Sequence, residues 1–598
     1  MSSVTEGTGR STAKAGSGFA MDRLARPEIL FIPALLILVP VYLMPVLDMM
    51  RGSFGEEGWS LALYHEALTN QAFLVILWRT LTLSAQVTVL VLLFGYPIAY
   101  MIVRAPEKQQ KWLLLLLALP LWTSALVRSF AWVVLLGRQG MVNDVATWIG
   151  LQTQPTQLLY NRGAVLVGFV HVMLPYVVFP LVSVMKRIPD RLTFTGRTLG
   201  AGRMTAFWTI FFPLSLPGVV SGGVLTFVLT IGYFVTPALL GGLSETTYVM
   251  LIQQQVETAF NWPLASAMSV VLLAVTLAIV AIFWRFIGTP DETAGRAGTL
   301  SRIFSGAVTT TVVQASRLAA LLPTRGSAYQ AERDRKAGAA IRIFVWVLLL
   351  FVLLPILILF PLGLSSATYL QFPPPGWSLR WYINYFSRAD WLASTWVSFQ
   401  VALSVMVIAT AIGTAAAVAI HRASPRYSAP MRGLMVSPLV VPTIVIAIAI
   451  YFQYAKLQLI GSVFGLTLAH CIVAMPIVVI IVEGALKRAR TGPERAARSL
   501  GASAVRAFLS TTFVTIRPSI ITAALFAFLT SFDDVVIALF LAGVNPTLPK
   551  RMWDGVNLEI DPTLAAVSSI LILVSVAVVL AVQGVTRATG ARSDQTAG

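Results

Sequence analysis

Two adjacent carboxylates, Asp533 and Asp534, lie inside a long apolar stretch of this chain. A charged side chain at mid-membrane costs about 2.5–3.5 kcal/mol on insertion scales, so intramembrane acids are functional candidates by default. Two acids beside a pathway would attract a cationic solute, and nearby aromatic rings would add cation–π contacts. The structural alternative is that one acid pairs with a basic residue such as Arg128, or caps a broken helix, and holds the chain together. The residues alone leave both interpretations open.

Two further residues complete a possible substrate pathway. Arg128 is as ambiguous as the acids, and the simplest account is a long side chain that snorkels to the outer lipid headgroups. In the first half of the chain, the positions aligned with the two acids are Gly232 and Tyr233. The acids are therefore not part of a shared scaffold, and the candidate pathway consists of Asp533, Asp534, Arg128 and Tyr233.

A second group of candidates comes from a basic, glycine-containing segment that occurs twice. Residues 197–207 return as residues 498–508, 301 positions later and without a gap. The identical pairs include Arg197/Arg498, Leu199/Leu500, Gly200/Gly501, Ala201/Ala502 and Phe207/Phe508. A chain that repeats itself in this way consists of two related halves, and the repeated loop is where each half performs its shared task.

Each copy of this loop is predicted as a short helix, a glycine break and a second helix that leads to Phe207 or Phe508. Such an element can insert into a groove on a partner and push the next span as a rigid body. The alternative is a positively charged loop that only fixes membrane topology. The gap-free repetition of the Gly-Ala pair and of the phenylalanine favours the first interpretation.

The elements that position these residues are membrane spans. The chain is 57% hydrophobic and 11% charged, whereas a soluble domain has about 25% charged residues. This composition predicts an all-α polytopic membrane protein, and the apolar runs give six spans to each repeated half, so that the two six-helix halves are parallel. The twelve predicted spans are 29–50, 72–103, 111–137, 163–185, 209–241, 265–287, 341–366, 391–421, 431–455, 461–484, 518–542 and 563–586.

The basic residues predict the orientation. Most of the 43 Lys and Arg residues fall in inner segments if the N-terminus is cytoplasmic, which then places the C-terminus there too. The basic inner segments face anionic lipid of the inner leaflet, which explains the net charge of +18 without nucleic acid as a partner. The predicted domains are a disordered cytoplasmic tail (1–28), a first transmembrane domain (29–287), a cytoplasmic linker (288–340), a second transmembrane domain (341–586) and a cytoplasmic tail (587–598). Within the linker, 300–322 is either an amphipathic surface helix or a tether.

The chain carries no signature of catalysis. No Gly-x4-Gly-Lys-Ser/Thr segment occurs, so no nucleotide site is predicted. One cysteine, Cys471, and four scattered histidines predict neither a metal site nor any other cofactor. We therefore expect a chain without enzymatic activity; that it is a translocation subunit, with ATP hydrolysed by a separate protein, is implied by a family resemblance of its repeated loop.

The repeated loop resembles the "EAA" loop of ABC importer permeases. Gly200 is followed by Ile210, Phe212 and Pro213 at the family's spacing. In the second copy, Ala496 and Ala497 are kept, while the family's acid is replaced and Glu494 stands one position early. The resemblance implies that each loop is the coupling helix that docks into an ATPase subunit.

Other motifs extend the resemblance over nearly the whole chain. Segments 126–132 (LVRSFAW) and 232–242 (GYFVTPALLGG) are similar to the first permease of spermidine/putrescine-type importers, and 372–382 (FPPPGWSLRWY) and 531–536 (SFDDVV) to the second. The chain thus looks like both permeases fused, with the transmembrane fold of type I ABC importers in a bacterial inner membrane. This implies two ATPase copies, a solute-binding protein and a small cationic solute, with a polyamine favoured over an opine, a phosphonate or ferric iron. The rivals are a carrier driven by an ion gradient, with the paired aspartates as its ion site, and an ATP-independent channel or scaffold.

Overall fold

The computed structural model describes residues 27–55, 59–199, 201–287, 327–558 and 561–595. Within these ranges the chain is helical, and its only bridge of β type joins Ser365 to Trp377. The helices of the first half are η1 (Pro27–Phe31), α2 (Ile32–Leu38), η2 (Val39–Leu43), α3 (Met44–Gly52), α4 (Ala62–Thr69), α5 (Gln71–Arg104), α6 (Glu107–Ala118), η3 (Leu119–Trp122), α7 (Ala125–Leu136), α8 (Met141–Trp148), α9 (Arg162–Met185), α10 (Asp190–Thr198), α11 (Arg203–Ala206), η4 (Phe207–Phe211), α12 (Phe212–Ile231), α13 (Val235–Leu240), η5 (Leu243–Glu245), α14 (Tyr248–Glu257) and α15 (Trp262–Ile287).

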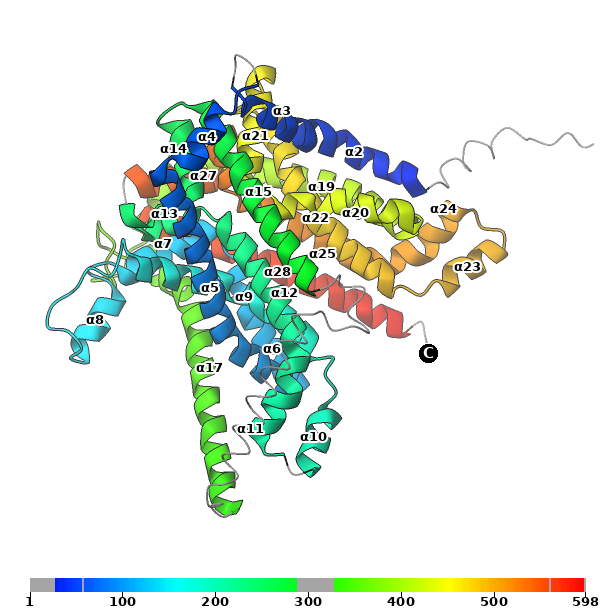
Figure 1. Cartoon of the computed structure of the whole chain (residues 1–598), viewed down its shortest axis with the longest axis horizontal. Helices are drawn as coiled ribbons and strands as arrows, with labels where there is room; N and C mark the ends of the chain where they lie inside the picture. Colours follow the sequence, from blue (N-terminus) through cyan, green and yellow to red (C-terminus); the bar gives the residue numbers. More distant parts are fainter. Residues whose placement is uncertain (1–26, 56–58, 200, 288–326, 559–560, 596–598) are drawn as a thin grey trace, which may run out of the picture.

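The helices of the second half follow residues 288–326. They are α17 (Ser327–Gly363), α18 (Arg380–Ser387), α19 (Ala389–Arg422), α20 (Pro425–Val440), α21 (Thr443–Leu457), α22 (Val463–Arg488), α23 (Gly492–Ser499), α24 (Ala504–Ala507), η6 (Phe508–Thr512), α25 (Phe513–Phe532), α26 (Val536–Leu541), α27 (Leu548–Leu558) and α28 (Thr563–Gln595). In Figure 1 the short pairs α10–α11 and α23–α24 project from the helical body at two separate places.

The predicted repeat is present in three dimensions. Helices α5 and α19 are both 34 residues long, and α12 and α25 are both 20 residues long. In each half, the first backbone N–H of a short helix donates to a hydroxyl of the long helix. Tyr248 donates to Thr80 over 2.8 Å, and Leu548 donates to Ser398 over 2.7 Å. The two halves therefore use the same internal contacts, as expected for related sequences.

The predicted number of twelve spans is not reproduced. Among the described residues, nine helices are long and apolar enough to cross a membrane, and two bent helix pairs raise the number to at most eleven. The segment predicted as the twelfth span contains a shorter apolar helix, Thr563–Val578. Helix α17 begins 14 residues before the predicted span at 341, and α28 continues through most of the predicted tail to Gln595. Residues 1–26, Gly200 and the 300–322 segment lie outside the described residues.

Two spans predicted as straight helices, 111–137 and 431–455, are broken. The segments Glu107–Leu121 and Ala125–Trp148 meet at 90°, and α20 and α21 meet at 99°. Pro442 stands in the second break, where its ring disfavours helical geometry at the residue before it and removes a backbone donor. Pro120 lies in the 3₁₀ turn that ends the first arm of the other pair.

Two more predicted spans, 209–241 and 518–542, are also interrupted. Helix α12 ends at Ile231 and α13 begins at Val235, while α25 ends at Phe532 and α26 begins at Val536. The paired aspartates therefore lie in a break between two helices, rather than within a helix as predicted. Such breaks leave backbone groups unpaired, so in a membrane they are tolerated where other parts of the protein or a cavity satisfy them.

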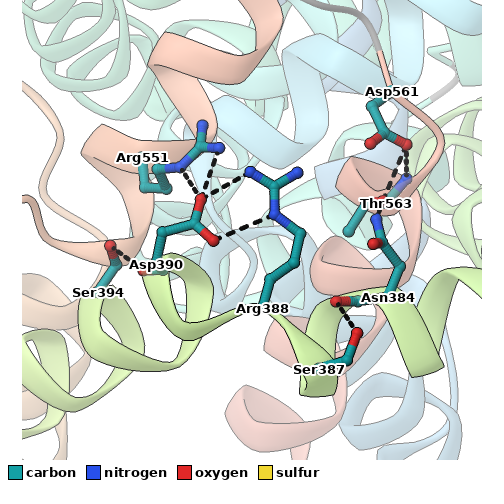
Figure 2. A network of polar contacts seen from close by, with 8 residues as sticks. All are labelled: Asn384, Ser387, Arg388, Asp390, Ser394, Arg551, Asp561 and Thr563. Carbon is teal, nitrogen blue, oxygen red and sulfur yellow. Dashed lines mark hydrogen bonds and ion pairs between the residues drawn. The ribbon is translucent and has the colours of Figure 1, made fainter.

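A polar network fixes one end of the second half (Figure 2). Asp390 accepts hydrogen bonds from Arg388 over 2.8 Å and from Arg551 over 2.9 Å, which joins α19 to α27. Asn384 of α18 donates to the hydroxyl of Thr563 at the start of α28 over 2.8 Å. The network therefore holds α27 in place, and α27 contributes to the cavity described next.

Candidate solute cavity and coupling elements

A cavity of about 320 Å³ lies where the two halves meet. Its first-half walls come from α7, α9 and the break after α12, and its second-half walls come from α21, α22, α25, α27, α28 and the break after α25. All four residues predicted for the substrate pathway line it: Arg128, Tyr233, Asp533 and Asp534. The fold thus brings together residues that are up to about 400 positions apart in the chain.

Asp533 joins the halves at the helix break. Its Oδ2 accepts a long hydrogen bond of 3.4 Å from the backbone N–H of Ala125, the first residue of α7. A carboxylate is favoured there because the start of a helix carries partial positive charge. On the other side of the repeat, the break at Gly232 packs against Pro442, so that an added Cβ would lie 3.0 Å from the Cβ of the proline. The break at Asp533 thus contacts the broken span of the first half, and the break at Gly232 contacts the broken span of the second half.

Asp534 caps the helix that follows it. Its Oδ1 accepts a 2.7 Å hydrogen bond from the backbone N–H of Ile537 in the first turn of α26. The Nε2 of the buried His470 lies 3.9 Å from the same oxygen, while Nδ1 of that histidine shares a 2.9 Å hydrogen bond with Ser531. The helix-capping alternative is therefore correct for Asp534, and the residue lines the cavity as well.

Arg128 does not snorkel to the headgroups, which corrects the simplest account from the sequence. Arg128 belongs to α7, and the residue is buried, with only 4% of its surface exposed. Among the described residues, its Nε and Nη1 atoms have no hydrogen-bond partner and no ion pair joins it to Asp533. Packing of α7 against α9, α13 and α17 closes the route to lipid that a single helix would offer.

Several buried polar atoms at the cavity are left without partners among the described residues. They are Nε and Nη1 of Arg128, Oη of Tyr233, Oδ1 of Asp533 and Oγ of Ser124. Buried polar groups in proteins are usually hydrogen-bonded, so such a cluster marks a place for water or a polar solute. With all three charged groups ionised, two carboxylates and one guanidinium give the cavity a net formal charge of −1.

The two repeated loops form the predicted helix–break–helix elements. In the second half, Gly501 has a φ of +90°, which favours glycine, and it separates α23 from α24. The first element is α10 followed by α11. Of the predicted residues, Leu199 and Leu500 are 83% and 89% exposed. The others divide into exposed Arg197, Ala496, Arg498 and Gly501 and half-buried Ala201, Phe207, Ala497, Ala502 and Phe508.

Contacts that the sequence did not predict tie each element to its long helix. Arg104 and Arg422 are the last residues of α5 and α19. Arg104 forms a 3.0 Å ion pair with Asp190, whereas Arg422 pairs with Glu494 and lies 4.7 Å from the ring centroid of Phe508. The signal was available, since each predicted long span ends next to an arginine.

Comparison with known proteins gives similarity to transport permeases. Residues 409–592 match the family model described as "Binding-protein-dependent transport system inner membrane component". The spermidine/putrescine transport system permease protein PotB of Haemophilus influenzae is 31% identical over 218 residues, which cover 36% of this chain and 76% of that protein. PotC of the same organism, named for the same transport system, is 26% identical over 245 residues, which cover 41% of this chain and 95% of that protein.

Two further similarities are more general. The inner membrane ABC transporter permease protein YdcU of Escherichia coli is 30% identical over 230 residues, covering 73% of that protein. One chain of the crystal structure of a bacterial alginate ABC transporter, in complex with an alginate pentasaccharide-bound periplasmic protein, aligns with a TM-score of 0.39 and 19% identity. The alignment covers 47% of this chain and 99% of that one.

Proposed function

The chain belongs to the family of binding-protein-dependent transport system inner membrane components, the permeases of ABC importers, and we propose that it carries a polyamine such as putrescine or spermidine. Members of this family are non-catalytic membrane subunits that work with an ATPase and a solute-binding protein. That membership favours an ATP-driven importer over a carrier driven by an ion gradient or a passive channel.

The cavity between the halves supports a cationic solute. Asp533 offers an unpartnered Oδ1 and Tyr233 an unpartnered Oη, and both accept hydrogen bonds from an ammonium group. Asp534 adds a second carboxylate to the lining. The volume of about 320 Å³ is at the lower end of the range for small-molecule sites, which suits a slender solute. Two of the similar permeases carry spermidine/putrescine in their names.

The proposed arrangement places one ATPase copy at each coupling element. The first element has its predicted contact residues at 197–207, with Gly200 among them, and the second at 496–508. The proposed domains are those of the sequence analysis, 29–287 and 341–586, with both termini in the cytoplasm. Closure of the two ATPases would move both elements, and the halves would rock around the cavity between them.

The test is solute-dependent ATP hydrolysis. The full chain is placed in nanodiscs with its ATPase and its binding protein, and hydrolysis is measured with putrescine, spermidine, a phosphonate or no solute. We expect stimulation by a polyamine-loaded binding protein. If hydrolysis does not respond to polyamines, the proposed solute is wrong; if uptake instead follows an imposed ion gradient, the importer mechanism is wrong.

One observation favours a second class of solute. The free N–H groups of Arg128 are donors, and a polyamine cannot accept from them, so in that case water must. An opine or a phosphonate carries an anionic group that would pair with Arg128 while its amino group meets Asp533. Under this alternative, an Arg128→Gln variant loses transport of the anionic solute, and the phosphonate arm of the same experiment shows the stimulation.

A further inference from the structure

A second cavity lies at one end of three membrane spans. It has a volume of about 710 Å³, and its walls come from the end of α5, the start of α6 and the first apolar turns of α17. The span Gln71–Arg104 ends here, while the span Ala339–Gly363 and the bent-pair arm Glu107–Leu121 begin here. Because the end of a span lies where hydrocarbon meets the lipid headgroups, the cavity lies at headgroup level.

The charged side chains of this cavity are basic. Among the described residues that line it, Arg104 and Arg342 carry charge and none is acidic. Arg104 already forms a 3.0 Å ion pair with Asp190. Arg342 is exposed, and no hydrogen bond or ion pair joins it to another described residue. The cavity therefore offers one guanidinium group whose charge no described residue balances.

The walls beside Arg342 are apolar. Trp112, Ile341 and Trp346 line the cavity, and each of them is more than 45% exposed. Tryptophan is enriched where hydrocarbon meets the headgroups, because its ring is apolar and its N–H is polar. Apolar walls and a guanidinium group at this level match the two parts of a phospholipid, an acyl chain and an anionic phosphate. A small soluble anion would pair with the arginine but would make no use of the apolar walls.

Contacts within the chain hold the three helices of the cavity together. Gln110 of α6 donates to the backbone carbonyls of Val103 and Ala105 over 3.2 and 2.9 Å, which joins α6 to the end of α5. The ring centroids of Phe94 in α5 and Phe344 in α17 lie 6.3 Å apart. Helices α5 and α6 belong to the first half and α17 to the second, so a molecule bound here contacts both halves.

We propose that this cavity binds an anionic phospholipid such as phosphatidylglycerol. The phosphate pairs with Arg342, Trp112 and Trp346 contact the glycerol and the upper part of an acyl chain, and the rest of the chain continues into the bilayer. The bound lipid links the first helix of the second half to the first half. The inference does not depend on the transported solute or on the partner proteins.

The test titrates the purified full chain in detergent with dioleoylphosphatidylglycerol, dioleoylphosphatidylcholine or inorganic phosphate. Native mass spectrometry counts the bound lipid molecules and gives the affinity of the tightest site. Arg342→Gln removes the unpaired charge, whereas Arg342→Lys keeps it. The matched control is Arg426→Gln, which removes an exposed arginine at the start of α20, another span end, that does not line the cavity.

We expect the wild type to bind phosphatidylglycerol about fivefold more tightly than phosphatidylcholine, which is the preference that one basic residue near a membrane surface gives to an anionic lipid. Arg342→Gln should abolish this preference and Arg342→Lys should retain most of it, with the control within about twofold of the wild type.

Three results would overturn the inference. Equal affinity of the wild type for the two lipids would mean ordinary contact with bilayer lipid. Equal effects of Arg342→Gln and Arg426→Gln would mean that any basic residue at a span end acts in the same way. Displacement of phosphatidylglycerol by inorganic phosphate would mean a site for a free phosphate rather than for a lipid.

Discussion

Replacing Asp533 by asparagine separates its two roles, because the amide keeps a carbonyl oxygen at the same place. That oxygen can still accept from the N–H of Ala125, where Oδ2 now accepts over 3.4 Å, and asparagine caps helices as well as aspartate does. The negative charge beside the solute is lost. A hydrogen bond to a charged group contributes about 1.5–3 kcal/mol, so solute binding in the cavity should weaken by about 10- to 100-fold.

The assay is solute uptake per ATP hydrolysed in proteoliposomes, with saturating loaded binding protein. We expect the Asp533→Asn variant to transport about tenfold less solute or worse, with an unchanged melting temperature. Asp533→Ala loses the cap as well, and leaving the N–H of Ala125 unpaired costs a further ~1–3 kcal/mol of stability. The control is Asp554→Asn, which removes an acid of α27 that pairs with Lys550 over 2.8 Å and does not line the cavity.

Two results would refute this reasoning. If the asparagine variant transports as well as the wild type, Asp533 does not contact the solute. If it melts at as low a temperature as the alanine variant, the residue acts through the junction between the halves alone.

Three further predictions concern packing and charge. Gly232→Val should cost about 1–3 kcal/mol of stability, because the new side chain meets Pro442 at 3.0 Å, whereas Gly433→Ala, with nothing within 4 Å, should leave the melting temperature unchanged or raise it. Gly501→Ala places a residue with a Cβ at a φ of +90°, which costs about 1–3 kcal/mol of backbone strain. We expect this strain to distort the loop, so that ATP hydrolysis is uncoupled from uptake while the complex still assembles. A variant with full coupling would disprove the requirement for glycine. Partial desolvation raises the pKa of the Glu257 carboxyl in α14, so the folded protein binds its proton more tightly and stability falls as pH rises through that pKa. Because Glu257 is an exposed residue, the effect is small. Glu257→Gln should raise the melting temperature slightly at pH 7 and lose this advantage as pH falls below about 4, which thermal unfolding at both pH values would check.

The sequence predicted the helical class, the two related halves and the helix–break–helix form of the repeated loops, because these depend on local patterns. An apolar run of about 20 residues is long enough to cross a membrane whatever it packs against. The repetition of Gly200 and Phe207 as Gly501 and Phe508, 301 residues later, is visible in the sequence alone. The helix breaks were also marked in part. Pro442 and the aspartates ahead of the apolar 536–541 run are both signals of a helix boundary, although the length of the apolar runs favoured continuous spans.

What surrounds a side chain was decided by the tertiary structure alone. Arg128 could reach the headgroups from an isolated helix, but the helices packed around α7 leave it at the cavity with Tyr233 and Asp533. The exchange of Glu494 for Thr193 reads as an ordinary substitution in the aligned halves. Only the fold shows that Glu494 pairs with Arg422 in the second half, whereas Asp190, from a different position of its element, pairs with Arg104 in the first. The lengths of the spans and the breaks in the helices follow from neighbouring residues along the chain. The burial of a side chain and its pairing partner depend instead on which distant helices pack together.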